Sequence, residues 1–159
     1  MERTITGYDY GQKEPMENEA MVLTLETQAR AIWPQERVFL KRLLGRPDLD
    51  VLDIGCGTGE IASRIMKEFS PGRVTGIDIA TSHIQLAQER FGNVPGLSFQ
   101  HGDATALPFE DDSFDVALCR HMLQAVPDPH RVISCRRSVT RRIAARAIVW
   151  ARCVPARAR

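Results

Sequence analysis

The chain has 159 residues, of which 43% are hydrophobic, and it carries a formal net charge of +1 at pH 7. This length supports one domain with a buried core and is too short for two ordinary domains. The apolar runs are shorter than the roughly 18 residues of a membrane-spanning helix, and none follows a basic start. We therefore expect a cytoplasmic protein without a membrane partner. The four cysteines lack the spacing of zinc ligands or of a disulfide scaffold, so we expect no metal.

Charge and glycine are unevenly distributed along the chain. The first 128 residues carry 12 Lys and Arg against 20 Asp and Glu, whereas the last 31 residues carry nine Arg and no acid. All eleven glycines lie between Gly7 and Gly102, although the turns of such a fold commonly need glycine. The composition therefore changes abruptly in the C-terminal quarter.

The predicted elements begin with two helices and continue as alternating strands and helices. Apolar positions at helical spacing predict helices over 16–33 and 35–44, with Pro34 in the first turn of the second. Short strands separated by single helices then predict βαβ units and a Rossmann-like, doubly wound, mostly parallel α/β sheet. The predicted strands are 49–54, 73–79, 97–101 and 113–119, the helices between them are about 59–69 and 81–91, and a later helix is traced by Val132, Cys135, Val139 and Ile143.

The segment Val51–Glu60 reads as a buried strand, an acid near its end and three alternating glycines that lead into a helix. Glycines have no Cβ atom and so allow a ligand to approach the backbone closely, while amides at a helix N-terminus attract an anionic group. A tight turn without a ligand would use the same residues. A dinucleotide site is another alternative, because residues 57–62 fit G-x-G-x-x-A and Asp78 follows about 20 residues later. In that fold, however, the first glycine directly follows the strand. Here an acidic residue and Gly55 come before Gly57, which disfavours the dinucleotide site.

This segment resembles the first motif, D/E-x-G-x-G-x-G, of the class I S-adenosylmethionine-dependent methyltransferases. Residues 78–79, 102–104 and 114–129 resemble later motifs of the small-molecule methyltransferases related to the enzymes of ubiquinone and menaquinone biosynthesis. The resemblance covers about residues 16–133. It implies the class I methyltransferase fold and S-adenosyl-L-methionine as the cofactor, with no need for a metal.

The resemblance implies that the cofactor-binding residues lie at the strand ends. Asp53 would offer negative charge near the cofactor's ammonium group, directly or through water. Asp78 would accept the ribose hydroxyls with Ile79 packed on the adenine, and Asp103 would accept the adenine amino group. Asp78 has the alternative role of a helix N-terminal acid ahead of Thr81, and residues 102–103 would otherwise form an ordinary turn. The full expected set is Asp53, Gly55, Cys56, Gly57, Gly59, Asp78, Ile79, Asp103, Ala104 and Arg120.

His121 is the one candidate for a catalytic role, because it follows the fourth strand where the strand end meets the expected cleft. An imidazole there could orient a substrate or accept its proton near neutral pH. The alternative is a side chain at a helix start that packs beside the methionine part of the cofactor. Tyr8 and Tyr10 belong either to an N-terminal lid or to a mobile tail.

We expect three segments: an N-terminal helical lid or cap at 1–45, a cofactor-binding core at 46–133 and an atypical arginine-rich tail at 134–159. The family normally continues with a Pro-Gly-Gly-type turn and further strands. Residues 147–150 offer a fifth strand, but no residues remain for strands six and seven, so we expect a sheet that is incomplete at its C-terminal strands. Strand four would then be an exposed edge. The composition suggests that residues from about Ser134 come from a shifted reading frame or a mis-called gene end.

The expected function is S-adenosylmethionine-dependent methyl transfer to an unidentified small-molecule acceptor. One alternative is an inactive remnant whose basic tail binds nucleic acid, which is disfavoured because the tail has no nucleic-acid recognition fold. A second alternative is an NAD(P)-binding Rossmann protein. The oligomeric state is left open.

Overall fold

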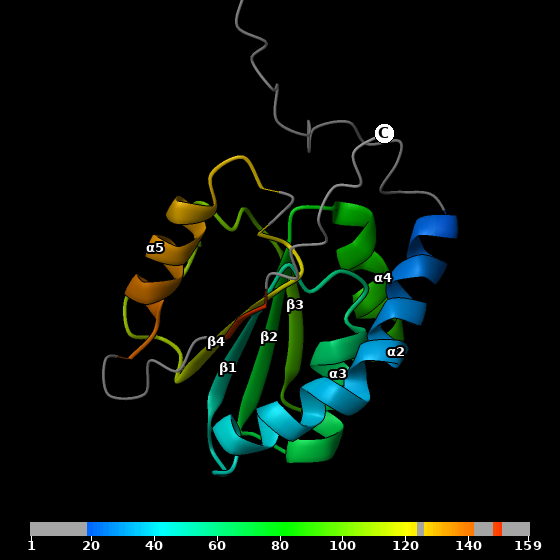
Figure 1. Ribbon diagram of the computed structural model, residues 1–159, viewed down its shortest axis with the longest axis horizontal. Helices are drawn as coiled ribbons and strands as arrows, with labels where there is room; N and C mark the ends of the chain where they lie inside the picture. The colour runs from blue at the N-terminus through cyan, green and yellow to red at the C-terminus, as the bar shows by residue number, and fades with distance from the viewer. Residues whose placement is uncertain (1–18, 124–125, 142–147, 151–159) are drawn as a thin grey trace, which may run out of the picture.

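A computed structural model describes residues 19–123, 126–141 and 148–150 of the chain. It contains a five-stranded parallel sheet with the strand order β3-β2-β1-β4-β5, flanked by helices (Figure 1). The strands are β1 (Asp50–Ile54), β2 (Arg73–Asp78), β3 (Leu97–His101), β4 (Val116–Arg120) and β5 (Ile148–Trp150). The helices are α2 (Glu19–Leu43), α3 (Glu60–Phe69), α4 (Thr81–Phe91) and α5 (Pro129–Val139). The predicted doubly wound, Rossmann-like sheet is confirmed.

The sheet buries an apolar cluster on each face. Helices α2, α3 and α4 cover one face, where Val51, Val74 and Leu118 contribute fully buried side chains. Helix α5 covers the other face, where Leu52, Ile54 and Val132 lie in the second cluster. Successive strand residues point to opposite faces, so a strand covered on both sides buries nearly all of its side chains. In β1 the four residues after Asp50 are buried: the apolar Val51, Leu52 and Ile54, and the acidic Asp53.

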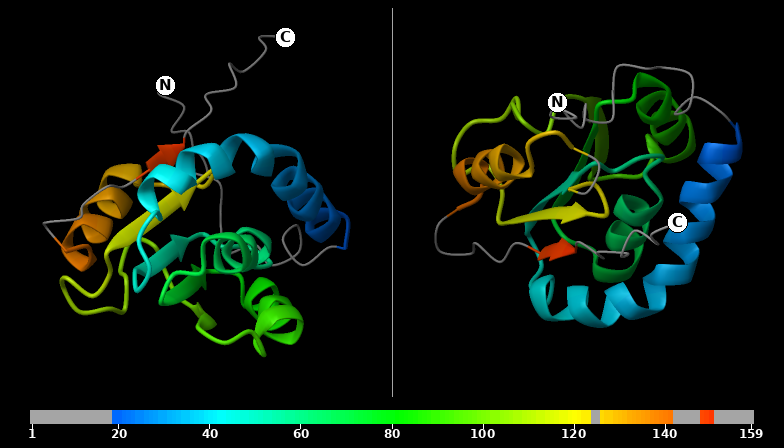
Figure 2. Two further views of the ribbon diagram at one scale, coloured as in Figure 1. Left: turned by 90° about the horizontal axis from the view of Figure 1, so that it is seen from below. Right: turned by 45° about the horizontal axis from the view of Figure 1, so that its top comes forward.

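The prediction of two N-terminal helices was wrong, because α2 is a single helix that contains Pro34. A proline inside a helix removes one backbone hydrogen bond and bends the axis, and α2 changes direction as it passes from the blue to the cyan segment in Figure 2. Contacts to α3 hold the helix on both sides of the proline. The indole Nε1 of Trp33 donates to Glu68 at 3.1 Å, and Arg37 pairs with the same carboxylate at 2.7 Å. Tertiary contacts therefore offset the cost of the proline.

Strand β4 is not the sheet edge along its last three residues, because Leu118–Arg120 pair with β5 in parallel register. The fifth strand expected from residues 147–150 is present at Ile148–Trp150. The strand begins at Val116, whereas 113 was expected, since Phe114 forms an isolated bridge with Thr140.

Helix α5 crosses the expected boundary between core and tail at residue 133. Asp128 caps it by accepting a hydrogen bond from the amide of Arg131 at 2.9 Å, as an N-terminal capping acid does. Beyond the helix, Arg141 pairs with Asp115 at 2.7 Å and with Asp50 at 3.4 Å. Residues 134–141 are thus integrated with the core. The expectations for Tyr8, Tyr10 and Ile143 lie outside the described residues.

Candidate functional site

The carboxyl ends of β1 to β4 bring the expected site residues to one edge of the sheet, where ligands bind in open α/β folds. The loop after β1 lies directly on the end of β2. The amides of Gly55 and Cys56 both donate to the carbonyl of Ile77, at 2.8 and 3.0 Å, and the amide of Gly59 donates to the carbonyl of Cys56 at 3.1 Å. The loop is therefore fixed by backbone hydrogen bonds before any ligand binds.

All three loop glycines have left-handed backbone angles, with φ of 72° at Gly55, 53° at Gly57 and 80° at Gly59. Side-chain-bearing residues adopt these angles at a cost. A Cβ atom on Gly59 would lie 2.8 Å from the ring of Phe99, whereas a Cβ atom on Gly57 would meet only a Leu25 methyl at 3.6 Å. Gly59 is therefore needed for packing inside the domain, while at Gly57 the described residues leave room for a Cβ atom.

The loop leads into the N-terminus of α3, which has no side-chain cap. Gly59 occupies the capping position with φ of 80° and makes no side-chain hydrogen bond. The first amides of a helix have no partner within the helix and carry partial positive charge. This end of α3 can therefore accept an anionic group of a ligand.

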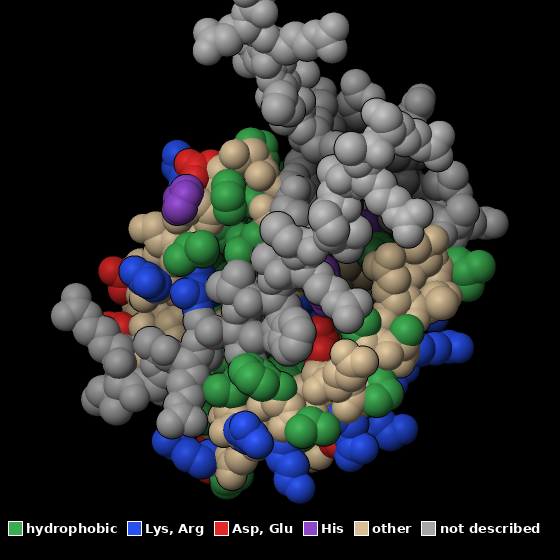
Figure 3. Space-filling view, in the orientation of Figure 1, with side chains coloured by type: hydrophobic (Ala, Val, Ile, Leu, Met, Phe, Trp, Pro, Cys, Tyr) green, Lys and Arg blue, Asp and Glu red, His purple; other side chains and the backbone are tan. Residues whose placement is uncertain are grey.

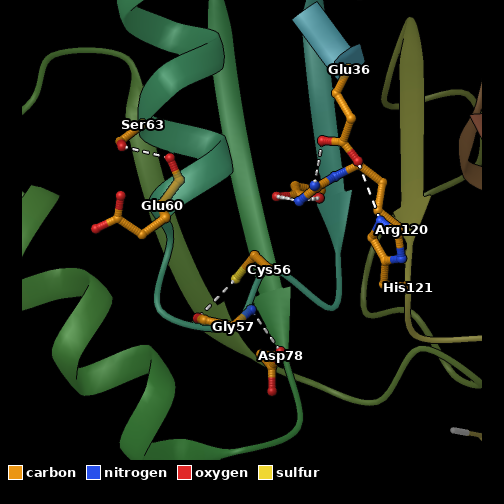
Figure 4. A network of polar contacts seen from close by, with 9 residues as sticks. Glu36, Cys56, Gly57, Glu60, Ser63, Asp78, Arg120 and His121 are labelled. Carbon is orange, nitrogen blue, oxygen red and sulfur yellow. Dashed lines mark hydrogen bonds and ion pairs between the residues drawn. The ribbon is translucent and has the colours of Figure 1, made fainter. Parts of the chain in front are cut away.

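Asp78, at the end of β2, faces the glycine loop. Its Oδ2 atom accepts the amide of Gly57 at 2.8 Å (Figure 4). Its Oδ1 atom accepts the amide of Ala80 at 2.9 Å. The imidazole Nδ1 of His83 lies 3.8 Å from the carboxylate. The next residue, Ile79, is 40% exposed, which is high for a large apolar side chain beside a buried strand end. Asp78 is thus held rigidly, and an apolar surface lies open next to it.

Asp103 and Ala104 follow β3 at the same edge. The amide of Gly102 donates to the carbonyl of Asp78 at 2.9 Å, so this turn adjoins the end of β2. The Oδ1 atom of Asp103 accepts both the amide and the hydroxyl of Thr105, at 2.7 and 2.8 Å, and the side chain is exposed. Ala104 is buried in the second apolar cluster. Asp103 therefore shapes its own turn and remains open to solvent.

Asp53 and Arg120 do not face the glycine loop as open groups but lie in a buried ion network with Glu36 of α2 (Figure 4). The guanidinium of Arg120 donates to Glu36 at 3.0 Å and lies 3.4 Å from the Asp53 carboxylate. Burial raises the pKa of Asp53, although the charge of Arg120 opposes the rise. The pKa of Arg120 is raised because the two carboxylates outweigh the effect of its own burial. Arg120 therefore stays cationic.

Glu36 was absent from the residues expected from the sequence. It lies on the inner side of α2, in line with the buried Trp33 and Leu40, and is itself only 4% exposed. A charged residue at a position of the apolar helical stripe is the signal that could have revealed it. The exposed basic residues of α2 are Arg30, Arg37, Lys41 and Arg42. Lys and Arg side chains gather along the lower and right edges of the face drawn in Figure 3.

His121 follows β4 directly and has a left-handed φ of 54°, which is strained for a residue with a side chain. Its imidazole Nε2 lies 3.5 Å from Glu36 Oε1, and its side chain is about one-third exposed. The next residue, Met122, lies against Gly55, since a Cβ atom there would be 3.0 Å from the methionine side chain. His121 therefore stands between the buried network and the open edge, where the sequence placed it.

Cys56 packs inside the loop rather than serving as a reactive thiol. Burial raises its pKa well above the ordinary value, and the nearby Asp53 and Asp78 add to the shift. Its Sγ atom occupies the space over Gly76, where a Cβ atom would approach it to 2.8 Å. The thiol therefore stays protonated at neutral pH, unlike a nucleophilic cysteine.

The comparisons with known proteins agree with this geometry. Residues 51–142 match a family described as "Methyltransferase domain". Over 105 residues the chain is 39% identical to an uncharacterised 37.1 kDa protein in transposon TN4556 of Streptomyces fradiae, a match that covers 65% of this chain and 30% of that protein. Over 99 residues it is 36% identical to demethylmenaquinone methyltransferase of Staphylococcus aureus, with 59% and 41% covered. The chain thus spans less than half the length of these relatives.

A solved structure gives the same result. The chain is 34% identical to a SAM-dependent methyltransferase from Methanosarcina mazei, with a TM-score of 0.54, over 60% of this chain and 49% of that one. Within the residues that the structure describes, no helix has the length and apolar character needed to cross a membrane. In the same residues no group of three His, Cys, Asp or Glu side chains is arranged to hold a metal ion.

Proposed function

Since this chain belongs to the methyltransferase-domain family, with the fold of the class I enzymes that use S-adenosylmethionine, we propose that it binds this cofactor at the carboxyl ends of β1 to β3. We further propose that it transfers the methyl group to a small-molecule acceptor. The observation that carries the proposal is the meeting of three left-handed glycines, an uncapped helix N-terminus and Asp78 at one sheet edge.

The residues at this edge fit the cofactor group by group. The open space at Gly57 and the free amides at the start of α3 suit the methionine carboxylate. Asp78, already fixed by two amides, has lone pairs left to accept ribose hydroxyls. The exposed Ile79 suits an adenine face, and we assign Asp103 to the adenine amino group because it lies exposed on the adjoining turn.

When bound, the cofactor supplies an electrophilic methyl group on a cationic sulfur. The protein's own part is to align the acceptor in line with the bond that breaks. We assign the acceptor's position to the edge beside His121, whose imidazole lies partly open at the end of β4. There it can orient the acceptor or take up its proton. Asp53 and Arg120 act from the buried network behind the loop, rather than by direct contact with the cofactor.

The small-molecule class of the acceptor is supported by the S. aureus relative, whose name gives demethylmenaquinone as its substrate. This support extends only to the class, because that match covers 41% of the relative. The segments of the relatives outside the matched region can determine which acceptor each relative binds, so the acceptor of this chain can differ from theirs.

Calorimetric titration of the purified chain with S-adenosylmethionine tests the proposal, with NADH as the rival ligand. We expect saturable binding of S-adenosylmethionine alone. Asp78→Asn removes the charge but keeps the shape, and it should weaken binding roughly 10- to 100-fold, as loss of a charged hydrogen-bond acceptor does. Asp111→Asn, on the exposed loop before β4, is the matched control and should leave affinity unchanged. Binding of NADH instead, or equal losses in the two variants, would show the proposal to be wrong.

A further inference from the structure

The buried network of Glu36, Arg120 and Asp53 contains two carboxylates and one guanidinium. Residue exposures are 4% for Glu36, 0% for Asp53 and 9% for Arg120. One guanidinium cannot balance two ionised carboxylates, so with both carboxylates ionised the network carries an excess negative charge in a region shielded from water. Burying such a charge is costly unless another group compensates it.

Of the two carboxylates, Glu36 is the one with an oxygen atom that lacks a hydrogen bond within the described residues. Its Oε2 atom accepts from Arg120, whereas its Oε1 atom is buried and receives no hydrogen bond within the described residues. The nearest cationic candidate is His121, whose Nε2 atom lies 3.5 Å away, outside ordinary hydrogen-bonding distance. No Lys or Arg of the described residues pairs with Oε1, and the basic side chains of α2 itself are exposed.

The network lies immediately behind the proposed cofactor site. Asp53 precedes Gly55 by two positions in the same strand-to-loop segment, and Arg120 precedes His121. The charge of Asp53 acts on the loop itself, where it adds to the rise that burial causes in the pKa of Cys56. In a partly buried region a unit charge changes the binding of another nearby charge substantially. Helix α2 contributes Glu36 from outside the glycine motif, which explains why the motif alone does not reveal it.

We propose that Glu36 is a specificity-determining residue, whose excess negative charge favours the cationic cofactor S-adenosylmethionine over its neutral-sulfur product S-adenosylhomocysteine. This inference rests on the proposed function. The two molecules differ by one methyl group and one positive charge, so a negative charge behind the site acts on one and not on the other. An unbalanced carboxylate that costs stability in the free protein thus gains its compensation when the cationic ligand binds.

The test compares affinities for both molecules by calorimetry in the wild type and in Glu36→Gln, at one pH and one ionic strength. Glutamine keeps the shape and can still accept from Arg120, while Asp53 balances the guanidinium. We expect the affinity for S-adenosylmethionine to fall roughly tenfold and that for S-adenosylhomocysteine to stay within about twofold, which is within the scatter of a neutral change. The free variant should melt at the same or a higher temperature, because a buried unbalanced charge is gone.

Glu68→Gln is the matched control, because Glu68 holds α2 to α3 through Trp33 and Arg37 without joining the network. It should leave the ratio of the two affinities unchanged. If Glu36→Gln fails to fold, Asp53→Asn takes its place in the test, because it removes one carboxylate charge from the other side of Arg120. An equal loss for both ligands would mean that Glu36 only supports the structure, and would overturn the inference while leaving the proposed function standing. Absence of binding by the wild type would overturn both.

Discussion

Gly57 and Gly59 stand two residues apart in one loop, yet their missing Cβ atoms serve different needs. At Gly59 the space is occupied by the ring of Phe99 and the methyl of Ala87, so the constraint comes from packing between α3, α4 and β3. At Gly57 the described residues place only Leu25 near this space, so the structural constraint there comes from the left-handed backbone angle. A motif written as G-x-G does not distinguish the two.

Substituting each glycine by alanine separates these roles. Gly59→Ala combines a left-handed alanine with a 2.8 Å contact to an aromatic ring, and it should lower the free energy of unfolding by about 2–4 kcal/mol. Gly57→Ala should cost only about 1 kcal/mol but weaken S-adenosylmethionine binding roughly tenfold. Chemical denaturation and calorimetry measure the two effects. Equal stability losses would show that Gly57 is also a packing position.

At the scale of elements, the amino ends of β1 and β4 are joined to the end of α5 by a cluster of ion pairs. Asp115 accepts the amide of Asp50 at 2.9 Å and pairs with Arg141. Burial tends to raise the pKa of Asp115, but these two contacts outweigh it, so the pKa lies below its usual value. A carboxyl group with a lowered pKa in the folded state stabilises the protein above its unfolded-state pKa, and this stability is lost as the pH falls through the folded-state value.

Asp115→Asn should therefore destabilise the protein at pH 7 by about 1 kcal/mol, because a charged acceptor is lost. The difference from the wild type should shrink below about pH 4, as the wild-type carboxylate takes up its proton. Denaturant titrations of both proteins at pH 7 and at pH 3 measure this. The raised pKa of Asp53 changes stability with pH in the direction opposite to that of Asp115. Because Asp53 is present in both proteins, its contribution cancels in the difference between them. A difference independent of pH would contradict the assignment.

At the scale of the whole molecule, ligand binding and folding are linked, because the proposed site is built from four strand ends that exist together only in the folded chain. S-adenosylmethionine at 100 times its dissociation constant should stabilise the protein by about 2.7 kcal/mol. The melting temperature should therefore rise with ligand concentration in the wild type. Asp78→Asn should shift the rise to higher concentrations. A concentration-independent melting temperature would exclude binding to the folded form.

The change of reading frame that the arginine-rich composition suggests stays a prediction. The structure integrates residues 134–141 through α5 and Arg141, and the family match extends to residue 142, so we now place any change of reading frame after residue 141. The coding DNA, translated in the other two frames beyond that codon, tests this. A Pro-Gly-Gly turn followed by an apolar strand would support a frame change. Stop codons without such a continuation would contradict it.

The sequence by itself determined that the strands form a parallel sheet and which residues lie at its carboxyl edge. Strand–helix alternation and the glycine segment are local patterns, and local patterns are set by steric and hydrophobic preferences of neighbouring residues. For this reason the predicted helices 59–69 and 81–91 lie within a residue of α3 and α4. The positions of Gly57 and Asp78 at one edge follow from the same rule, since parallel strands end on the same side.

Only the tertiary structure decided which groups meet across long separations in the chain. Pro34 continues a helix because Trp33 and Arg37 hold α2 on Glu68, 35 and 31 residues away. Asp53 turned out to be buried against Arg120, 67 residues later, rather than open beside the loop. Glu36 meets Arg120 over 84 residues. Charge pairing in a low-dielectric interior depends on distances in space and on burial, and neither can be obtained from the spacing of residues along the chain.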